Sequence, residues 1–112
     1  MNKNEKLIDW IREYEAYKGE QVETIVFGEF DWGYTQYKSS PPCGKLMSLD
    51  EAMPYLAIEF LNDWGELGCP PFVAYTANWI ISAYAYDGLV SAYSMRRNPV
   101  EGYIPYMPGS ST

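Results

Sequence analysis

The chain has 112 residues, 47% of them hydrophobic and 21% charged, and its fifteen acidic against eight basic residues leave a formal charge of −7. These values are typical of one globular domain spanning residues 1–112, because a disordered chain would be poorer in apolar residues and two domains in this length would each be marginally stable. The absence of histidine excludes His-ligated zinc, Ser-His or Cys-His catalysis and a histidine pH switch.

Residues 4–18 are predicted to form an amphipathic helix that begins at Asn4 as N-cap and stops at Gly19. Apolar side chains recur in this segment at the three- and four-residue spacing of one helix face, at Leu7, Ile8, Ile11 and Tyr14. The opposite face is charged and includes Glu13 and Glu15. We expect that face to be exposed to solvent.

The next segment, 22–30, is rich in β-branched and aromatic residues and predicts a strand. A long loop is expected over 31–47, where two glycines and a proline pair interrupt regular structure. Long loops without regular structure are often functional. This one carries a cluster of aromatic and polar residues suited to contact with a partner: Asp31, Trp32, Tyr34, Gln36 and Tyr37.

A second helix is predicted over 49–64. Ser48 and Glu51 have the spacing of a capping box, and apolar residues follow on one stripe as far as Trp64. Pro54 lies inside this segment and cannot donate a hydrogen bond to the carbonyl of Asp50, so we expect either a kink there or a separate first turn.

The strongest local signal is Asp87-Gly88, which separates two strand-like segments, 79–86 and 89–96. An Asp-Gly pair favours a two-residue hairpin turn. The resulting register places Tyr86 opposite Leu89 and Ile80 opposite Met95. One face of this hairpin would be rich in tyrosine, and could be either core or an exposed platform; the other would carry small residues.

These segments predict an α+β fold, in which an antiparallel sheet is packed by two helices. The sheet would consist of the hairpin 79–86/89–96 with strands near 22–30 and 72–76, followed by an extended, Pro/Gly-rich tail at 98–112. The side chains expected to be buried in its core are Leu7, Ile11, Ile25, Phe27, Leu56, Phe60, Ile81 and Val90.

Charge is distributed unevenly. Residues 1–66 hold thirteen acidic and six basic residues, a net of −7, whereas residues 67–112 are neutral overall. Such asymmetry disfavours direct binding of nucleic acid, and can either attract a basic partner or simply keep a tyrosine-rich domain soluble. The acidic residues assigned to partner binding are Glu13, Glu15, Glu20 and Glu23.

Cys43 and Cys69 are expected to be free thiols, because the chain shows no secretory signal and two cysteines in such a chain are more often reduced. No apolar segment has the length needed to cross a bilayer. We therefore expect a cytoplasmic protein with no membrane association.

The sequence contains no Gly-rich phosphate loop and no metal-binding spacing, so we expect no enzyme activity, no metal and no cofactor. The short length, the acidic balance, and the lack of a signal and of catalytic motifs resemble those of small phage- or mobile-element-encoded accessory proteins. That class suggests an anti-CRISPR, anti-restriction or other anti-defence inhibitor that blocks a basic or nucleic-acid-binding surface of a host protein. The alternatives are an immunity protein or antitoxin, or a carbohydrate- or ligand-binding module that uses Trp32, Tyr34 and Tyr37. Two copies could also pair through the hairpin edge as a homodimer.

Overall fold

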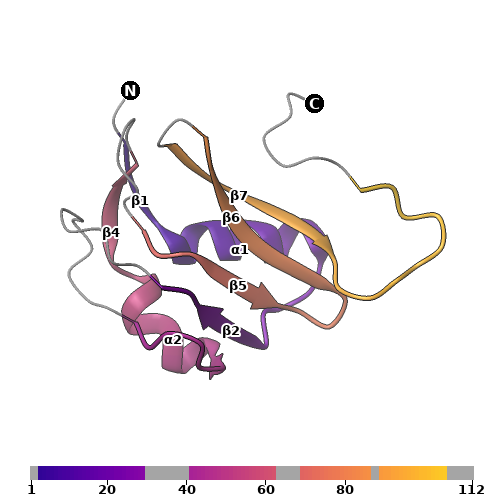
Figure 1. The fold of residues 1–112 in the computed structure, drawn as a ribbon, viewed down its shortest axis with the longest axis horizontal. Helices are drawn as coiled ribbons and strands as arrows, with labels where there is room; N and C mark the ends of the chain where they lie inside the picture. Colours follow the sequence, from indigo (N-terminus) through magenta and orange to yellow (C-terminus); the bar gives the residue numbers. More distant parts are fainter. Residues whose placement is uncertain (1–2, 30–40, 63–68, 87–88, 106–112) are drawn as a thin grey trace.

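The computed structural model describes residues 3–29, 41–62, 69–86 and 89–105, with the side chains of residues 3, 61, 62, 85, 86, 89 and 90 left out. The described part is an α+β fold with a two-stranded sheet, β1-β4, and a five-stranded antiparallel sheet in the order β3-β2-β5-β6-β7 (Figure 1). Its elements in chain order are β1 (Lys3–Lys6), α1 (Leu7–Lys18), β2 (Thr24–Phe27), β3 (Met47–Ser48), α2 (Leu49–Leu56), β4 (Glu59–Asn62), β5 (Phe72–Tyr75), β6 (Trp79–Tyr86) and β7 (Leu89–Arg96). The predicted fold class is confirmed.

The predicted hairpin is also confirmed. Strands β6 and β7 pair antiparallel from Trp79 opposite Arg96 to Tyr86 opposite Leu89, which is the expected register. The Asp87-Gly88 connection itself lies outside the described residues. On the other side of β6, the short strand β5 pairs with it and with β2, so that the hairpin forms one end of the larger sheet.

The first helix begins later than predicted. Helix α1 starts at Leu7, with Lys6 in extended conformation as N-cap, and stops as predicted at Gly19, which has a left-handed φ of 72°. The preceding residues, 3–6, form β1 instead of a first helical turn. They do so because β4 supplies a backbone partner, with Glu5 opposite Phe60.

The second helix is shorter than predicted. Its capping box is present, since Glu51 N donates to Ser48 Oγ at 3.1 Å and Ser48 N donates to Glu51 Oε1 at 2.9 Å. Helix α2 nevertheless ends at Leu56, two residues after Pro54. The chain then extends into β4, so the prediction of helix over residues 57–62 is wrong, and residues 63–64 lie outside the described part.

Strand β2 is shorter than the predicted 22–30 and is followed by a close contact between two segments. Gly28 N donates to Pro71 O at 2.8 Å, and a Cβ atom on Gly28 would lie only 2.9 Å from the Pro71 ring. Glycine suits this position because any larger residue would crowd the Pro71 ring while the two segments are held together by the Gly28–Pro71 hydrogen bond. Strand β5 closely matches the predicted segment 72–76.

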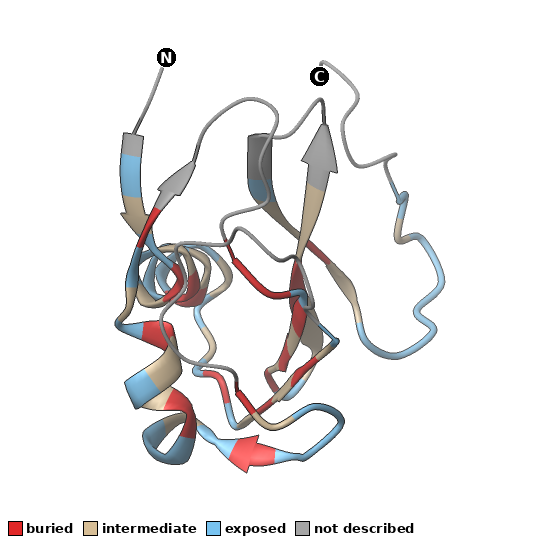
Figure 2. Ribbon diagram, turned by 60° about the vertical axis from the view of Figure 1, so that its left-hand side comes forward, coloured by how far each residue is buried: buried red, intermediate tan, exposed pale blue. Residues whose placement is uncertain are grey.

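The core lies between the helices and one face of the larger sheet. Buried residues appear on the sides of these elements that face each other (Figure 2). The side chain of Val90 lies outside the description, and the other seven predicted core residues are at most 1% exposed: Leu7, Ile11, Ile25, Phe27, Leu56, Phe60 and Ile81. Phe60 is buried as predicted, although it lies on a strand and not on a helix.

Candidate partner-binding surface

The aromatic cluster predicted to contact a partner cannot be placed. Asp31, Trp32, Tyr34 and Tyr37 all lie outside the described residues. The structure therefore bears on the acidic part of the predicted surface, to which α1 and the segment that follows it contribute.

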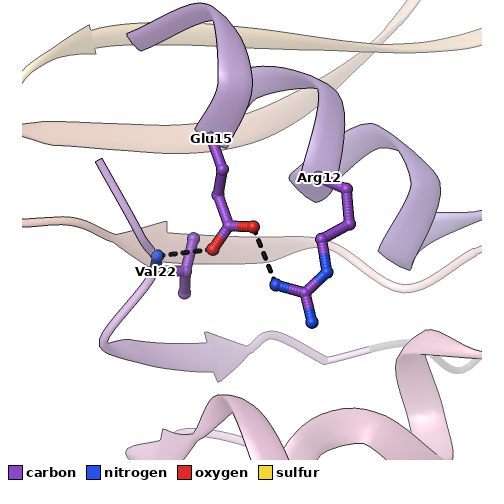
Figure 3. Close-up of polar contacts among 3 residues, drawn as sticks. All are labelled: Arg12, Glu15 and Val22. Atoms are coloured by element: carbon purple, nitrogen blue, oxygen red, sulfur yellow. Dashed lines mark hydrogen bonds and ion pairs between the residues drawn. The ribbon is translucent and has the colours of Figure 1, made fainter. Parts of the chain in front are cut away.

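Glu15 does not belong to an exposed surface. It is 9% exposed, on the inner side of α1, and its two carboxylate oxygens are both engaged (Figure 3). Glu15 Oε2 accepts a hydrogen bond from Val22 N at 2.7 Å, and Oε1 accepts one from the Arg12 guanidinium at 2.8 Å. The carboxylate ties the segment after α1 back to the helix, and its assignment to partner binding is corrected. Its position four residues after buried Ile11 is the sequence signal that could have revealed this.

Glu20 also has a structural role. The half-buried carboxylate accepts hydrogen bonds from Thr76 Oγ1 at 2.6 Å, Asn78 N at 2.9 Å and Asn78 Nδ2 at 2.6 Å. These bonds favour the charged form of the carboxyl and so hold the pKa of Glu20 below its usual value. The bond from the Asn78 side-chain amide has the largest effect. Glu20 thus secures the turn between β5 and β6, and most of its accepting capacity is used within the fold.

Three acidic residues of this region remain available to a partner. Asp9 and Glu13 lie one turn apart on the exposed side of α1, and Glu23 is exposed just before β2. None of the three side chains makes a hydrogen bond or ion pair with another described residue. We call this set the exposed N-terminal acids. Asp9 was not among the residues selected from the sequence for partner binding.

A group of cations and aromatic rings at the β5–β6 turn was not predicted. Lys18 Nζ lies 3.8 Å from the centre of the Trp79 ring, and the Arg96 guanidinium carbon lies 5.0 Å from it. Arg97 lies over the Tyr75 ring at 5.3 Å and donates to Thr76 O at 2.7 Å. Cation–π contacts of this kind hold the end of α1 against the sheet. The predicted register already placed Arg96 opposite Trp79, but nothing in the sequence placed Lys18 beside them.

The tyrosine-rich face of the hairpin is half-buried where it is described. Tyr84 and Tyr93 pack against each other with ring centres 5.9 Å apart, and Ile80 and Met95 on the same face are also half-buried. The opposite face packs against α1, whose Tyr14 hydroxyl donates to Ala92 O at 3.1 Å. The small-residue face therefore belongs to the core side, and the tyrosine face is turned away from α1.

Both cysteines are free thiols in different environments, Cys43 exposed and Cys69 buried. Burial raises the pKa of Cys69 to about 12. A thiol reacts as its thiolate, so we expect one thiol to react rapidly in the folded protein and two after unfolding. Titration with an aromatic disulfide reagent, with Cys43→Ser as the control that removes the rapid phase, measures this. Two rapid thiols in the folded protein would contradict it.

Neither a metal centre nor a membrane span emerges from the described segments. They contain no group of three Cys, Asp or Glu side chains arranged to hold a metal ion. No helix within them combines the length and apolar character needed to cross a bilayer.

Comparison with known proteins adds no relative. No protein-family model, no curated protein and no solved structure matches the chain. The functional argument therefore rests on the chain's own residues: the exposed N-terminal acids, the cation–aromatic group at the β5–β6 turn and the tyrosine face of the hairpin.

Proposed function

We propose that this protein is a non-catalytic binding protein, an acidic inhibitor of the phage- or mobile-element type that acts in the cytoplasm. Its partner would be a host protein with a basic or nucleic-acid-binding surface. The observation that supports this proposal is a difference among the acidic residues of α1 and the segment after it: some make hydrogen bonds within the fold, and the others are exposed to solvent. Glu15 and Glu20 form hydrogen bonds that hold the fold together, whereas Asp9, Glu13 and Glu23 are exposed and make no hydrogen bond or ion pair with another described residue.

Exposed carboxylates act mainly through their summed field. A single exposed charge contributes little to affinity, but several of one sign attract an oppositely charged surface over a distance of about 10 Å at moderate salt. This attraction raises the association rate and is weakened by salt. Asp31, Trp32, Tyr34 and Tyr37 remain the proposed source of short-range contacts, in which aromatic rings would anchor the complex.

Reversing the three exposed N-terminal acids should slow association with the partner about tenfold or more and flatten its salt dependence. The variant is Asp9→Lys/Glu13→Lys/Glu23→Lys. Glu15 and Glu20 are left intact, because changing them would disturb the fold. The partner is first isolated on immobilised protein from a host lysate, and association rates are then compared at about 50 and 150 mM salt.

The matched control carries the same change in net charge at exposed acids elsewhere, Asp50→Lys/Glu59→Lys/Glu101→Lys. It should slow association much less, because its charges lie outside the proposed surface. Thermal unfolding of both variants establishes that they are folded. Equal rates for the two variants, or wild-type association that does not change with salt, would show that the exposed N-terminal acids serve solubility alone.

A further inference from the structure

The face of the larger sheet that points away from the helices is apolar. Both helices lie on the other face, where Lys18 of α1 covers Trp79 and Tyr55 of α2 contacts Phe27 (Figure 2). Side chains alternate along a strand, so the residues next to Trp79 and Phe27 point outward. We call the apolar side chains that point this way the outer face: Val26, Val73, Ile80, Tyr84, Tyr93 and Met95.

The register makes the outer face continuous across four strands. Val26 lies opposite Val73, Val73 opposite Ser82, and Ser82 opposite Tyr93. The Ser82 hydroxyl already donates to Phe72 O at 2.7 Å, so it adds no unpaired polar group. The six side chains are half-buried, as expected where neighbours in a sheet cover their sides. From the strand and residue spacings, the outward positions span about 300 Å². A continuous apolar patch of about that size on a monomer is often an interaction site.

The outer face also lacks negative charge. The chain carries −7, yet none of the described outward residues of β2, β5, β6 and β7 is acidic. Beside this face, the Arg97 guanidinium lies over the Tyr75 ring at 5.3 Å. The exposed acids Asp9 and Glu13 lie on α1, on the other side of the sheet. A basic partner is therefore attracted to α1 and not to the outer face.

We infer that the outer face packs against the outer face of a second copy of the chain, so that two sheets lie face to face in a symmetric dimer. A two-fold axis brings the same patch of both copies into contact, and an apolar patch is complementary to itself. Sheets packed in this way lie about 10 Å apart, with strand directions within about 30° of each other. Helix α1 and its acids then lie on the two outer sides of the dimer, which keeps like charges apart.

The face suits a dimer better than the hairpin edge that the sequence suggested. At that edge the Tyr14 hydroxyl donates to Ala92 O, and Ser94 is only 4% exposed. A strand arriving there would have to displace these contacts. Neither Ala92 nor Ser94 points to the outer face, so we place the dimer on the face of the sheet and not on its edge.

The size and charge of the two molecules determine how strong the dimer should be. Two copies would bury about 600 Å² in total, which is below the range of stable complexes, so we expect a weak and reversible dimer. Repulsion between two molecules of −7 opposes it, and salt should therefore strengthen it. The proposed host partner should respond to salt in the opposite direction. The inference does not depend on that proposed function, and the two can fail separately.

Sedimentation equilibrium of the full chain, from about 10 μM to 1 mM, tests the dimer. A species of twice the 12.9 kDa monomer mass should form as concentration rises, and more of it at about 500 than at about 50 mM salt. Ile80→Glu should raise the dissociation constant about tenfold or more, because it places a carboxylate in the apolar junction. Leu46→Glu is the matched control. It makes the same change of charge at a leucine that is 66% exposed outside the outer face, and should change the constant less than about threefold.

Methyl NMR of the unaltered protein locates the contact without relying on a variant that must fold. On dilution from about 1 mM, the methyl signals of Val73, Ile80 and Met95 should shift. Those of Leu46 and Ile104, which are exposed elsewhere, should not. A monomer at every concentration overturns the inference, and is the result expected if only a host protein covers the outer face. Equal effects of the two glutamate variants, or shifts confined to Leu46 and Ile104, also overturn it.

Discussion

Replacing Glu15 with alanine should lower the free energy of unfolding by about 2–3 kcal/mol, because hydrogen bonds to a charged group are worth about that much and a buried N–H left without a partner is costly. The group left behind is Val22 N, on a residue that is 6% exposed. Urea unfolding followed by circular dichroism measures the change.

Two further variants locate the effect in that hydrogen bond. Glu15→Gln keeps an oxygen acceptor for Val22 N and should recover most of the loss, since an ion pair with the half-exposed Arg12 contributes at most about 1 kcal/mol. Glu13→Ala, on the exposed side of the same helix, should change stability by no more than about 0.5 kcal/mol. Equal losses for the alanine variants at 13 and 15 would contradict the structural role of Glu15.

Replacing Phe60 with alanine should cost about 3–5 kcal/mol, through lost burial and the cavity left behind. Phe60 is 1% exposed, and its ring contacts Trp10 edge-on at 5.7 Å, which joins β4 to α1. Thermal or urea unfolding measures the loss. Glu59→Ala, at the neighbouring exposed position of β4, is the control and should be nearly neutral. A loss below about 1 kcal/mol for Phe60→Ala would place this ring outside the core.

Elements determined by residues close together in the sequence were predicted correctly from those residues. The Asp-Gly pair predicted every residue pair between β6 and β7, and the capping residues predicted where α2 begins. The N-terminal strand could not be predicted in this way. Residues 3–6, Lys-Asn-Glu-Lys, have no preference for a strand and become one only because β4, more than fifty residues later, pairs with them.

The end of α2 was mispredicted for a related reason. Leu56 and Phe60 are four residues apart, which suits a helix face, but both are also buried when the chain straightens after Leu56. A strand of four residues shows too little alternation of apolar and polar residues to be recognised in the sequence, so the four-residue spacing typical of a helix was the stronger signal. Within the candidate surface, the exposed positions of Glu13 and Glu23 were predicted. The inward position of Glu15 was missed because a polar residue on the buried face of a helix is identified by its hydrogen-bond partner, and Val22 N becomes that partner only in the folded chain.

The order of strands has a consequence for how the protein forms during synthesis on the ribosome. The first half of the chain emerges first, yet α1 packs against β6 and β2 pairs with β5, so its partners are made later. The β6–β7 hairpin, made late, needs only its own residues, and hairpins form in about 1–10 microseconds. Pairing β1 with β4, or β2 with β5, must first close long loops, which slows folding. We therefore expect the newest part of the nascent chain to acquire fixed pairing early and to provide the surface on which the older part folds.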